Sequence, residues 1–276
     1  MLKNLVIRTI SGVVFAGIMI AAIWLPPYLF GIVFLLITIL ALREFYTLSG
    51  YIEGVKTEKI FSIISGATLF LCFFLYFFQK ELTISVPVQI FGIYSLCITA
   101  LFLSELFRNK KNPVLNIALS LMGHIYIAVP FGFICMMENM HEMYVFAFFL
   151  IIWASDTGAY VVGICIGKHK MFERVSPKKT WEGFFGGMIF ALITSFILNK
   201  ATEGGSLLEL WQWLVFALAV FIFGTLGDLV ESLFKRSLNV KDSGSLMPGH
   251  GGALDRFDSA IIAAPAVFVF LTICAK

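Results

Sequence analysis

The chain has 276 residues, of which 59% are hydrophobic and 13% are charged, and its formal net charge at pH 7 is +3. Soluble domains carry about 25% charged residues, so this composition excludes the soluble fold classes and indicates an integral membrane protein. The small net charge gives no support for a nucleic-acid partner. The five cysteines lie in apolar runs without a CxxC pair, which predicts neither a zinc site nor a disulfide framework.

Apolar runs of about 20 residues, the length that crosses a bilayer as a helix, recur along the whole chain. They lack the alternation of apolar and polar residues that outer-membrane barrels show. We therefore predict an all-α, polytopic integral membrane protein with about nine transmembrane helices. The expected spans are residues 9–25, 28–42, 60–78, 86–106, 114–137, 144–166, 184–199, 210–234 and 257–275.

The basic residues are divided unequally between the two sets of alternate loops. Of the 20 lysines and arginines, only Lys80, Lys200 and Lys276 fall on the side opposite to the N-terminus. Because short cytoplasmic loops carry the excess of Lys and Arg, we expect the N-terminus to be cytoplasmic and the C-terminus to be external.

The two halves of the chain differ in chemical character. Residues 1–140, with about five spans, contain few polar groups within the membrane, and residues 141–276, with about four spans, are the predicted catalytic region. In the first half, Glu44 is interpreted as a solvated charge at a helix end. His124, within an apolar run, is interpreted as a packed and hydrogen-bonded histidine.

Asp156 stands near the middle of the sixth span. A carboxylate at that depth costs about 2.5–3.5 kcal/mol on insertion scales, so its side chain should face the protein interior or a wet cavity. A hydrogen bond between helices is one interpretation. A polar wall of an active site is the favoured one, because intramembrane acids mark functional sites by default.

A basic segment precedes the seventh span. Ser176-Pro177 is expected to open a turn, and Thr180 is expected to begin the next helix with Glu182 in its first turn. Lys178 and Lys179 would then lie beside free N–H groups at a helix N-terminus, an arrangement that suits a phosphate. Anchoring of a cytoplasmic loop explains two lysines equally well, and the neighbouring Ser, Thr and Gly residues favour phosphate binding.

A polar run, residues 227–258, separates the last two spans. On the helix that enters it, Asp228, Ser232 and Lys235 share one face because they are spaced i, i+4 and i+7. Asp255 and Asp258, three residues apart at the start of the last helix, can point the same way. Several glycines between these helices allow a close approach of backbone to a ligand.

Three carboxylates from two helix ends form a hard-oxygen site of the kind that Mg²⁺ prefers. Carboxylates for a metal together with cations for phosphate indicate phosphoryl or nucleotidyl transfer. The alternative is that Asp255 caps a helix and that Arg256 pairs with Asp258, but this leaves Asp228 and the glycines without a role. The nearby cations are Lys235, Arg236, Lys241 and Arg256.

The polar run reads Ser232-x-Phe234-Lys235-Arg236-x4-Lys241-Asp242-x-Gly244-x3-Pro248-x-His250-Gly251-Gly252-x2-Asp255-Arg256-x-Asp258. It resembles the signature of the phosphatidate cytidylyltransferases, also called CDP-diacylglycerol synthases. Residues 156–160 and 176–183 resemble a second conserved region of that family. The resemblance is close over about residues 150–265, whereas the first half is similar only in its hydrophobic layout. Met247 and Ala253 stand where other aliphatic residues are usual.

The resemblance implies that CTP and phosphatidate react to give CDP-diacylglycerol and pyrophosphate for phospholipid biosynthesis. It also implies dependence on Mg²⁺, a second, monovalent cation such as K⁺, a homodimer, and an active site on the cytoplasmic side of the cell inner (plasma) membrane. The family's metal ligands carry over to Asp228, Asp255 and Asp258. We expect these aspartates, Lys235 and Arg236 to be catalytic. Expected contacts with substrate come from Asp156, Ser176, Lys178, Lys179, Thr180, Ser232, Lys241, Asp242, His250, Gly251, Gly252 and Arg256.

Three other functions compete with this one. A CTP-dependent transferase acting on another lipid phosphate differs only in the lipid, for which the sequence offers no selective feature. Secondary transporters also contain intramembrane acids and glycine-broken helices. Here, however, the charges other than Asp156 gather at one membrane face, and no inverted repeat is evident. A structural scaffold gives the three aspartates no purpose.

Overall fold

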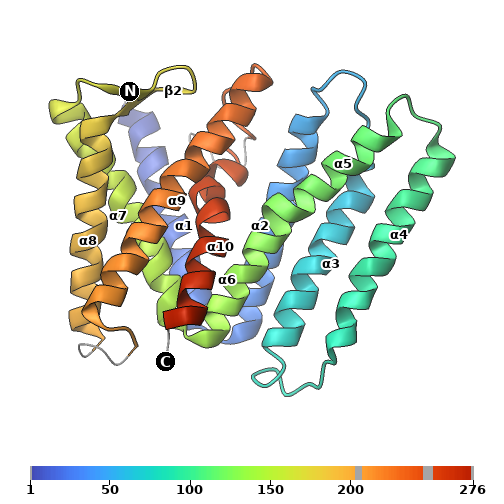
Figure 1. The fold of residues 1–276 in the computed structure, drawn as a ribbon, viewed down its shortest axis with the longest axis horizontal. Coiled ribbons are helices and arrows are strands. Elements are labelled where there is room, and N and C mark those ends of the chain that lie inside the picture. Colours follow the sequence, from blue (N-terminus) through green and yellow to red (C-terminus); the bar gives the residue numbers. More distant parts are fainter. Residues whose placement is uncertain (1, 203–206, 245–250, 275–276) are drawn as a thin grey trace. The chain divides into compact units, whose positions relative to one another are not determined.

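The computed structural model describes residues 2–202, 207–244 and 251–274, with side chains from residue 11 onwards. The helices and strands are, in chain order (Figure 1), α1 (Leu2–Trp24), α2 (Pro27–Ser49), α3 (Lys59–Phe77), the short η1 (Val88–Ile90), α4 (Phe91–Arg108), α5 (Pro113–Gly123), the π-helical turn η2 (His124–Ala128), α6 (Val129–Met140), α7 (Glu142–Ile166), β1 (Lys170–Phe172), β2 (Ser176–Thr180), α8 (Trp181–Ala201), α9 (Leu210–Ser237) and α10 (Leu254–Cys274).

The described part of the chain contains eight helical segments that are long and apolar enough to cross a membrane, and α1 contributes a shorter apolar stretch at Ser11–Trp24. The prediction of an all-α, multi-pass membrane protein is confirmed. Eight of the nine expected spans overlap these eight segments, and the first expected span, 9–25, overlaps the shorter stretch of α1. Some helices extend past the predicted limits, as where α2 continues to Ser49, because the helix runs on through polar residues that hydropathy does not count. Others are shorter, as where α4 begins at Phe91 instead of residue 86.

A small antiparallel hairpin, β1–β2, precedes α8, with Lys170 paired to Thr180 and Phe172 to Ser176. The turn occupies residues 173–175, so the expected turn at Ser176-Pro177 is wrong by a few residues. Pro177 lies within β2. Each strand of a two-stranded hairpin has an outer edge without a partner strand, so a proline, which has no N–H to donate, is tolerated there.

Residue contacts divide the chain into two units. The first unit contains residues 1–139 and 238–257, and the second contains residues 140–237 and 258–276.

An aromatic and polar core holds the first unit together. Phe30 and Phe34 are fully buried and stacked, with ring centroids 4.3 Å apart. His124 is also buried: its Nε2 lies 3.0 Å from Ser65 Oγ, and its Nδ1 lies 3.2 Å from the hydroxyl of Tyr94. The interpretation of His124 as a packed, hydrogen-bonded histidine is confirmed.

In the second unit, glycines allow α7 and α8 to pack closely. A Cβ on Gly186 would lie 2.5 Å from the side chain of Val162, and one on Gly187 would lie 2.8 Å from the carbonyl oxygen of Ser155. Small residues at such contacts let two membrane helices approach each other. The pair forms a support for the hairpin that joins them.

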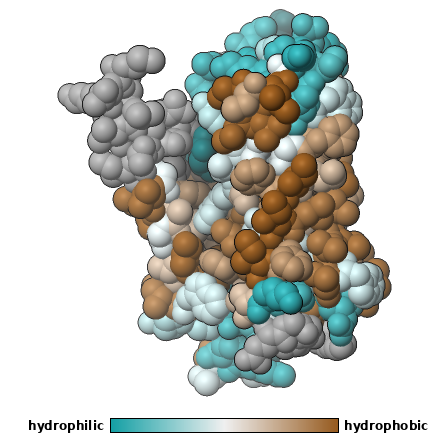
Figure 2. All heavy atoms as spheres, turned by 90° about the vertical axis from the view of Figure 1, so that its left-hand side faces the viewer, coloured by the Kyte–Doolittle hydropathy of each residue, from teal (hydrophilic) through white to brown (hydrophobic). Residues whose placement is uncertain are grey.

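The outer face of α8 is apolar along its length. Phe185, Ile189, Ile193 and Ile197 recur every four residues, and each is about half exposed. Figure 2 shows hydrophobic residues in a broad region below a hydrophilic upper end. A helix with this stripe of large apolar side chains is suited to contact with lipid.

Candidate active site

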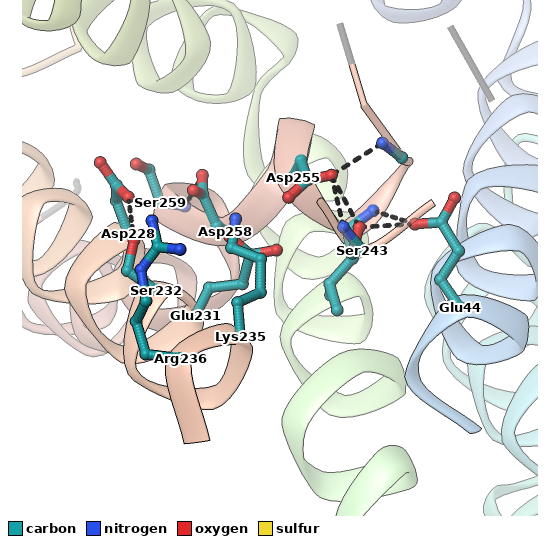
Figure 3. A network of polar contacts seen from close by, with 12 residues as sticks. Glu44, Asp228, Glu231, Ser232, Lys235, Arg236, Ser243, Asp255, Asp258 and Ser259 are labelled. Atoms are coloured by element: carbon teal, nitrogen blue, oxygen red, sulfur yellow. Dashed lines mark hydrogen bonds and ion pairs between the residues drawn. The ribbon is translucent and has the colours of Figure 1, made fainter. Parts of the chain in front are cut away.

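In the second unit, α9 meets the start of α10 at a glycine. A Cβ on Gly227 would lie only 2.4 Å from the carbonyl oxygen of Asp258 and 3.1 Å from the Cα of Ser259. Only glycine leaves room for this approach of two backbones. Because Asp228 follows Gly227 directly, the contact brings Asp228 beside Asp258 (Figure 3).

Asp258 lies in the electric field of several charged groups of the second unit. The negative charges of Asp228 and Asp156 repel a negative charge on Asp258, and the positive charge of Lys235 attracts it. The charges of two other aspartates, one on α7 and one on α9, thus reach Asp258 of α10.

Both oxygens of Asp228 have partners. Lys179 Nζ lies 2.7 Å from Oδ2, and the hydroxyl of Ser232 donates to Oδ1 at 3.2 Å. The expectation that Asp228 and Ser232 share one helix face is confirmed. The pairing with Lys179 also joins β2 to α9, two elements that the sequence did not connect.

Lys235 is held by a glutamate that the sequence interpretation did not include among the site residues. Its Nζ lies 2.5 Å from Glu231 Oε2, and the two side chains are 12% and 1% exposed. A buried ion pair of this kind fixes the position of the ammonium group. The Glu-to-Lys spacing of i, i+4 is the sequence signal that could have revealed it.

The end of the hairpin is fixed by a helix cap. The Thr180 hydroxyl accepts a hydrogen bond from the N–H of Gly183 at 3.2 Å, and Glu182 lies in the first turn of α8. Both features confirm the predicted helix start. Thr180 is buried, whereas Lys178 is exposed and Lys179 is directed to Asp228. Ser176 is partly buried at the start of β2.

Two further contacts hold the segment that carries Lys179. Glu182 accepts hydrogen bonds from the N–H groups of Lys168 and His169, and its Oε1 lies 2.6 Å from His169 Nδ1. At the turn of the hairpin, Arg236 Nε donates to the carbonyl oxygen of Val175 at 3.5 Å. The sequence interpretation missed His169, and no short-range pattern marks it.

In the first unit, Glu44 of α2 caps α10. Its carboxylate accepts hydrogen bonds from the N–H groups of Ala253 at 2.9 Å and Leu254 at 2.8 Å, and from the hydroxyl of Ser243 at 3.0 Å. The interpretation of Glu44 as a solvated helix-end charge is wrong. Its partners lie about 200 residues away in the chain, so no local pattern indicates them.

Asp255 forms a second set of contacts in the same loop (Figure 3). Its Oδ2 accepts hydrogen bonds from the N–H of Ser243 at 2.9 Å, the hydroxyl of Ser243 at 2.9 Å and the N–H of Gly252 at 2.8 Å. Gly251 has φ of +84°, a conformation that favours glycine. Asp255 therefore orders the loop before α10, and its role as a metal ligand stays a prediction.

The other predicted site residues are placed as follows. Lys241, Asp242 and Arg256 are exposed and Gly252 is buried, all in the first unit. Asp156, on α7 of the second unit, is exposed. Its charge acts on Asp258. His250 lies outside the described residues.

Comparison with known proteins identifies the family. The sequence model of the cytidylyltransferase family matches residues 6–274. The chain belongs to the cytidylyltransferase family. Curated relatives named phosphatidate cytidylyltransferase, from Staphylococcus epidermidis, Staphylococcus haemolyticus and Staphylococcus aureus, are each 38% identical to it over 184 to 186 residues, which is 67% of this chain and 70% of each relative. The resemblance inferred from the sequence is confirmed.

The residues of this cytidylyltransferase can be tested for their fit to Mg²⁺. Among the described residues, no three His, Cys, Asp or Glu side chains are grouped so that they could hold one ion. Mg²⁺ needs no such cage, because it keeps several waters and binds through one or two carboxylates together with substrate phosphates. Asp228 and Asp258 provide two neighbouring hard-oxygen donors on separate helices. This pair fits Mg²⁺ in the presence of a phosphate-bearing substrate.

Proposed function

We propose that this protein transfers the cytidylyl group of CTP to phosphatidate, giving CDP-diacylglycerol and pyrophosphate. The observation that carries the proposal is the contact of α9 with α10 at Gly227, which sets Asp228 beside Asp258 with Lys179 and Lys235 close by. Acidic groups for a metal and ammonium groups for phosphates are the two requirements of nucleotidyl transfer. The similarity to enzymes named phosphatidate cytidylyltransferase supports this choice of substrates.

The reaction needs charge neutralisation more than proton transfer. A phosphate oxygen of phosphatidate, already ionised at neutral pH, attacks the α-phosphorus of CTP, and the bond from that phosphorus to the bridging oxygen breaks. Pyrophosphate leaves with the electron pair. Because both reactants are anions, the main barrier is their repulsion, and donors aimed at the phosphate oxygens lower it.

Lys179 and Lys235 are the ammonium groups proposed for this role. Each is held by a carboxylate, Lys179 by Asp228 and Lys235 by Glu231, so each is positioned before substrate arrives. The exposed Lys178 and Arg236 add positive charge near the hairpin. Mg²⁺ held by Asp228 and Asp258 would supply Lewis-acid charge to phosphate oxygens.

We further propose that the reaction takes place at the cytoplasmic face of the plasma membrane and that the protein forms a homodimer. The cytoplasmic side is supported by the excess of basic residues in the loops on that side, and the plasma membrane is proposed from the family resemblance. The dimer and a monovalent cation such as K⁺ are proposed from the family resemblance alone. Chemical crosslinking of purified protein in detergent tests the dimer.

The test of the reaction uses purified protein, radiolabelled CTP, phosphatidate and Mg²⁺. We expect labelled liponucleotide and pyrophosphate in equal amounts, and at least about 100-fold less product from Asp228→Asn or Asp258→Asn. Glu173→Gln, which changes an exposed acid in the hairpin turn, is the matched control. Product at the wild-type rate from either Asn variant would remove that residue from the site. Solute flux in proteoliposomes without nucleotide turnover would favour a transporter instead.

The metal proposal has its own readout. Mn²⁺ in place of Mg²⁺ should bind the protein in the presence of CTP, as measured by electron paramagnetic resonance, and Asp258→Asn should weaken that binding by about tenfold or more. Unchanged Mn²⁺ binding by both Asn variants would contradict the proposed ligands, whatever the activity.

A further inference from the structure

A cavity of about 550 Å³ lies in the first unit, between the α2–α3 loop and the end of α4. Its lining includes Lys56, Thr57, Glu58, Lys59 and Arg108. None of these residues belongs to the candidate active site, and the function proposed above gives the cavity no role.

Thr57 gives the first indication of a ligand. The residue is only 7% exposed, and its hydroxyl has no hydrogen-bond partner in the structure. Buried polar groups in proteins nearly always have a partner. Because Thr57 lines the cavity, an oxygen atom of a bound molecule is a natural partner for this hydroxyl.

The start of α3 gives the second indication. The helix begins at Lys59, and its N-cap residue, Glu58, makes no side-chain hydrogen bond to the first turn. The uncapped N–H groups of a first turn carry partial positive charge and bind anions such as phosphate. The first residues of α3, Lys59 and Ile60, line the cavity.

The charges around the cavity favour an anion. Arg108 is already paired, with its Nε 3.0 Å from Glu58 Oε2 and its Nη1 in contact with Glu105 Oε1. Glu58, the acidic residue of the cavity lining, is therefore neutralised by Arg108. The ion pairs of the described residues include neither Lys56 nor Lys59, and both lysines are exposed.

The surroundings of the cavity fit a ligand at the membrane boundary. Ile60 and Ile64, one turn apart on α3, are 71% and 53% exposed. Large exposed apolar side chains on a membrane-spanning helix face lipid. Because Ile60 also lines the cavity, an apolar surface suited to an acyl chain adjoins the polar lining residues.

We propose that this cavity is a binding site for a phosphate ester, with Lys56, Lys59 and the hydroxyl of Thr57 as its donors. The phosphate comes either from an anionic phospholipid headgroup or from a soluble phosphate compound. The site shares no residue with those assigned to catalysis, and it does not depend on the reaction proposed above.

The experiment measures lipid binding to the purified full-length protein by native mass spectrometry, with phosphatidylglycerol as the probe and phosphatidylcholine as the zwitterionic comparison. Lys56→Gln/Lys59→Gln should bind phosphatidylglycerol about tenfold more weakly than the wild type. The double variant Lys110→Gln/Lys111→Gln is the matched control, because it removes the same charge from an exposed loop outside the cavity. Thr57→Val, which removes only the hydroxyl, should weaken binding several-fold.

Addition of millimolar inorganic phosphate distinguishes the two sources. Displacement of phosphatidylglycerol from the wild type indicates a site for soluble phosphate compounds, and undisturbed lipid binding indicates a headgroup site. Equal lipid binding by the wild type and Lys56→Gln/Lys59→Gln would overturn the proposal. An equal loss in Lys110→Gln/Lys111→Gln would also overturn it, because the attraction would then be general surface charge.

Discussion

Glu44 shows how one side chain can order a distant loop. Its carboxylate accepts two backbone N–H groups at the start of α10 and one hydroxyl from Ser243. Hydrogen bonds to a charged group contribute about 1.5–3 kcal/mol each. A Cβ on Gly252 would lie 2.2 Å from Glu44 Oε2, so the loop and the acid fit each other closely.

Glu44→Gln should therefore destabilise the protein by about 1–3 kcal/mol, because an amide NH₂ replaces one of the two acceptor oxygens and faces an N–H donor. The midpoint of thermal unfolding in detergent measures the effect. Glu53→Gln is the control, since Glu53 is an exposed acid of the same unit. Equal midpoints for the two variants would show that the cap contributes nothing.

The two adjacent lysines of β2 should contribute unequally to activity. Lys179 contacts Asp228 at 2.7 Å, whereas Lys178 is exposed. We expect Lys179→Gln to lower kcat/KM for CTP by about 100-fold and Lys178→Gln by about tenfold or less. Steady-state kinetics on both variants provides the comparison. Equal losses would indicate that both lysines act through general charge and that the contact with Asp228 has no special role.

At the scale of single residues, the sequence predicted contacts between near neighbours. The bond of Asp228 to Ser232 follows from i, i+4 spacing, and the cap at Thr180 follows from the residues around it. The sequence did not predict the contact of Lys179 with Asp228 or of Glu44 with Ala253. Those pairs depend on tertiary packing, which leaves no periodic signal.

At the scale of elements, Gly227 controls the approach of α9 to α10. Gly227→Ala would place a Cβ 2.4 Å from a backbone oxygen, so the two helices must move apart, with a cost of about 1–3 kcal/mol. Gly224, one turn earlier on α9, is the matched control, because a Cβ there would lie 3.5 Å from the Cβ of Ser259, an ordinary contact.

We expect Gly227→Ala to lose most of its activity, since Asp228 and Asp258 would separate, and to unfold at a lower temperature. Gly224→Ala should be close to the wild type in both measurements. Activity and thermal unfolding on the same preparations check this. Full activity in Gly227→Ala would mean that the distance between the two helices does not matter for the reaction.

The limits of the elements also show what a sequence can predict. Runs of apolar residues located the eight long apolar helices of the described residues, because favourable transfer into lipid requires about 20 mainly apolar residues in succession. The hairpin of β1 and β2 was not predicted, since its eight residues are mostly polar and charged and lack the alternation of a half-buried strand. Its position depends on the cap at Thr180 and on the bond of Arg236 to Val175.

At the scale of the whole molecule, the fold class followed from composition and hydropathy, whereas the place of residues 238–257 in the first unit did not. Residues 238–257 belong to the first unit although they follow α9 of the second. Contacts such as those of Glu44 with Ser243 and Leu254 produce this assignment. A division that depends on contacts between distant segments cannot be read from the order of apolar runs.

The orientation of the chain in the membrane gives the last prediction. Since all but three of the 20 basic residues fall on the side of the N-terminus, the β1–β2 turn should be cytoplasmic and the loop after α3 should be external. Glu173 and Glu81, one in each segment, are exposed. Each can be changed to cysteine in a protein whose five native cysteines are replaced by alanine, provided that this background retains activity.

A thiol reagent that does not cross membranes should label Glu81→Cys in intact spheroplasts and should label Glu173→Cys only after the membrane is permeabilised. The lysines and aspartates of the candidate site would then face the compartment that holds CTP. The reverse labelling pattern would place Lys179 and Asp228 on the external side, away from nucleotide. In that case the proposed reaction could not draw on cytoplasmic CTP, and the distribution of basic residues would need another physical cause.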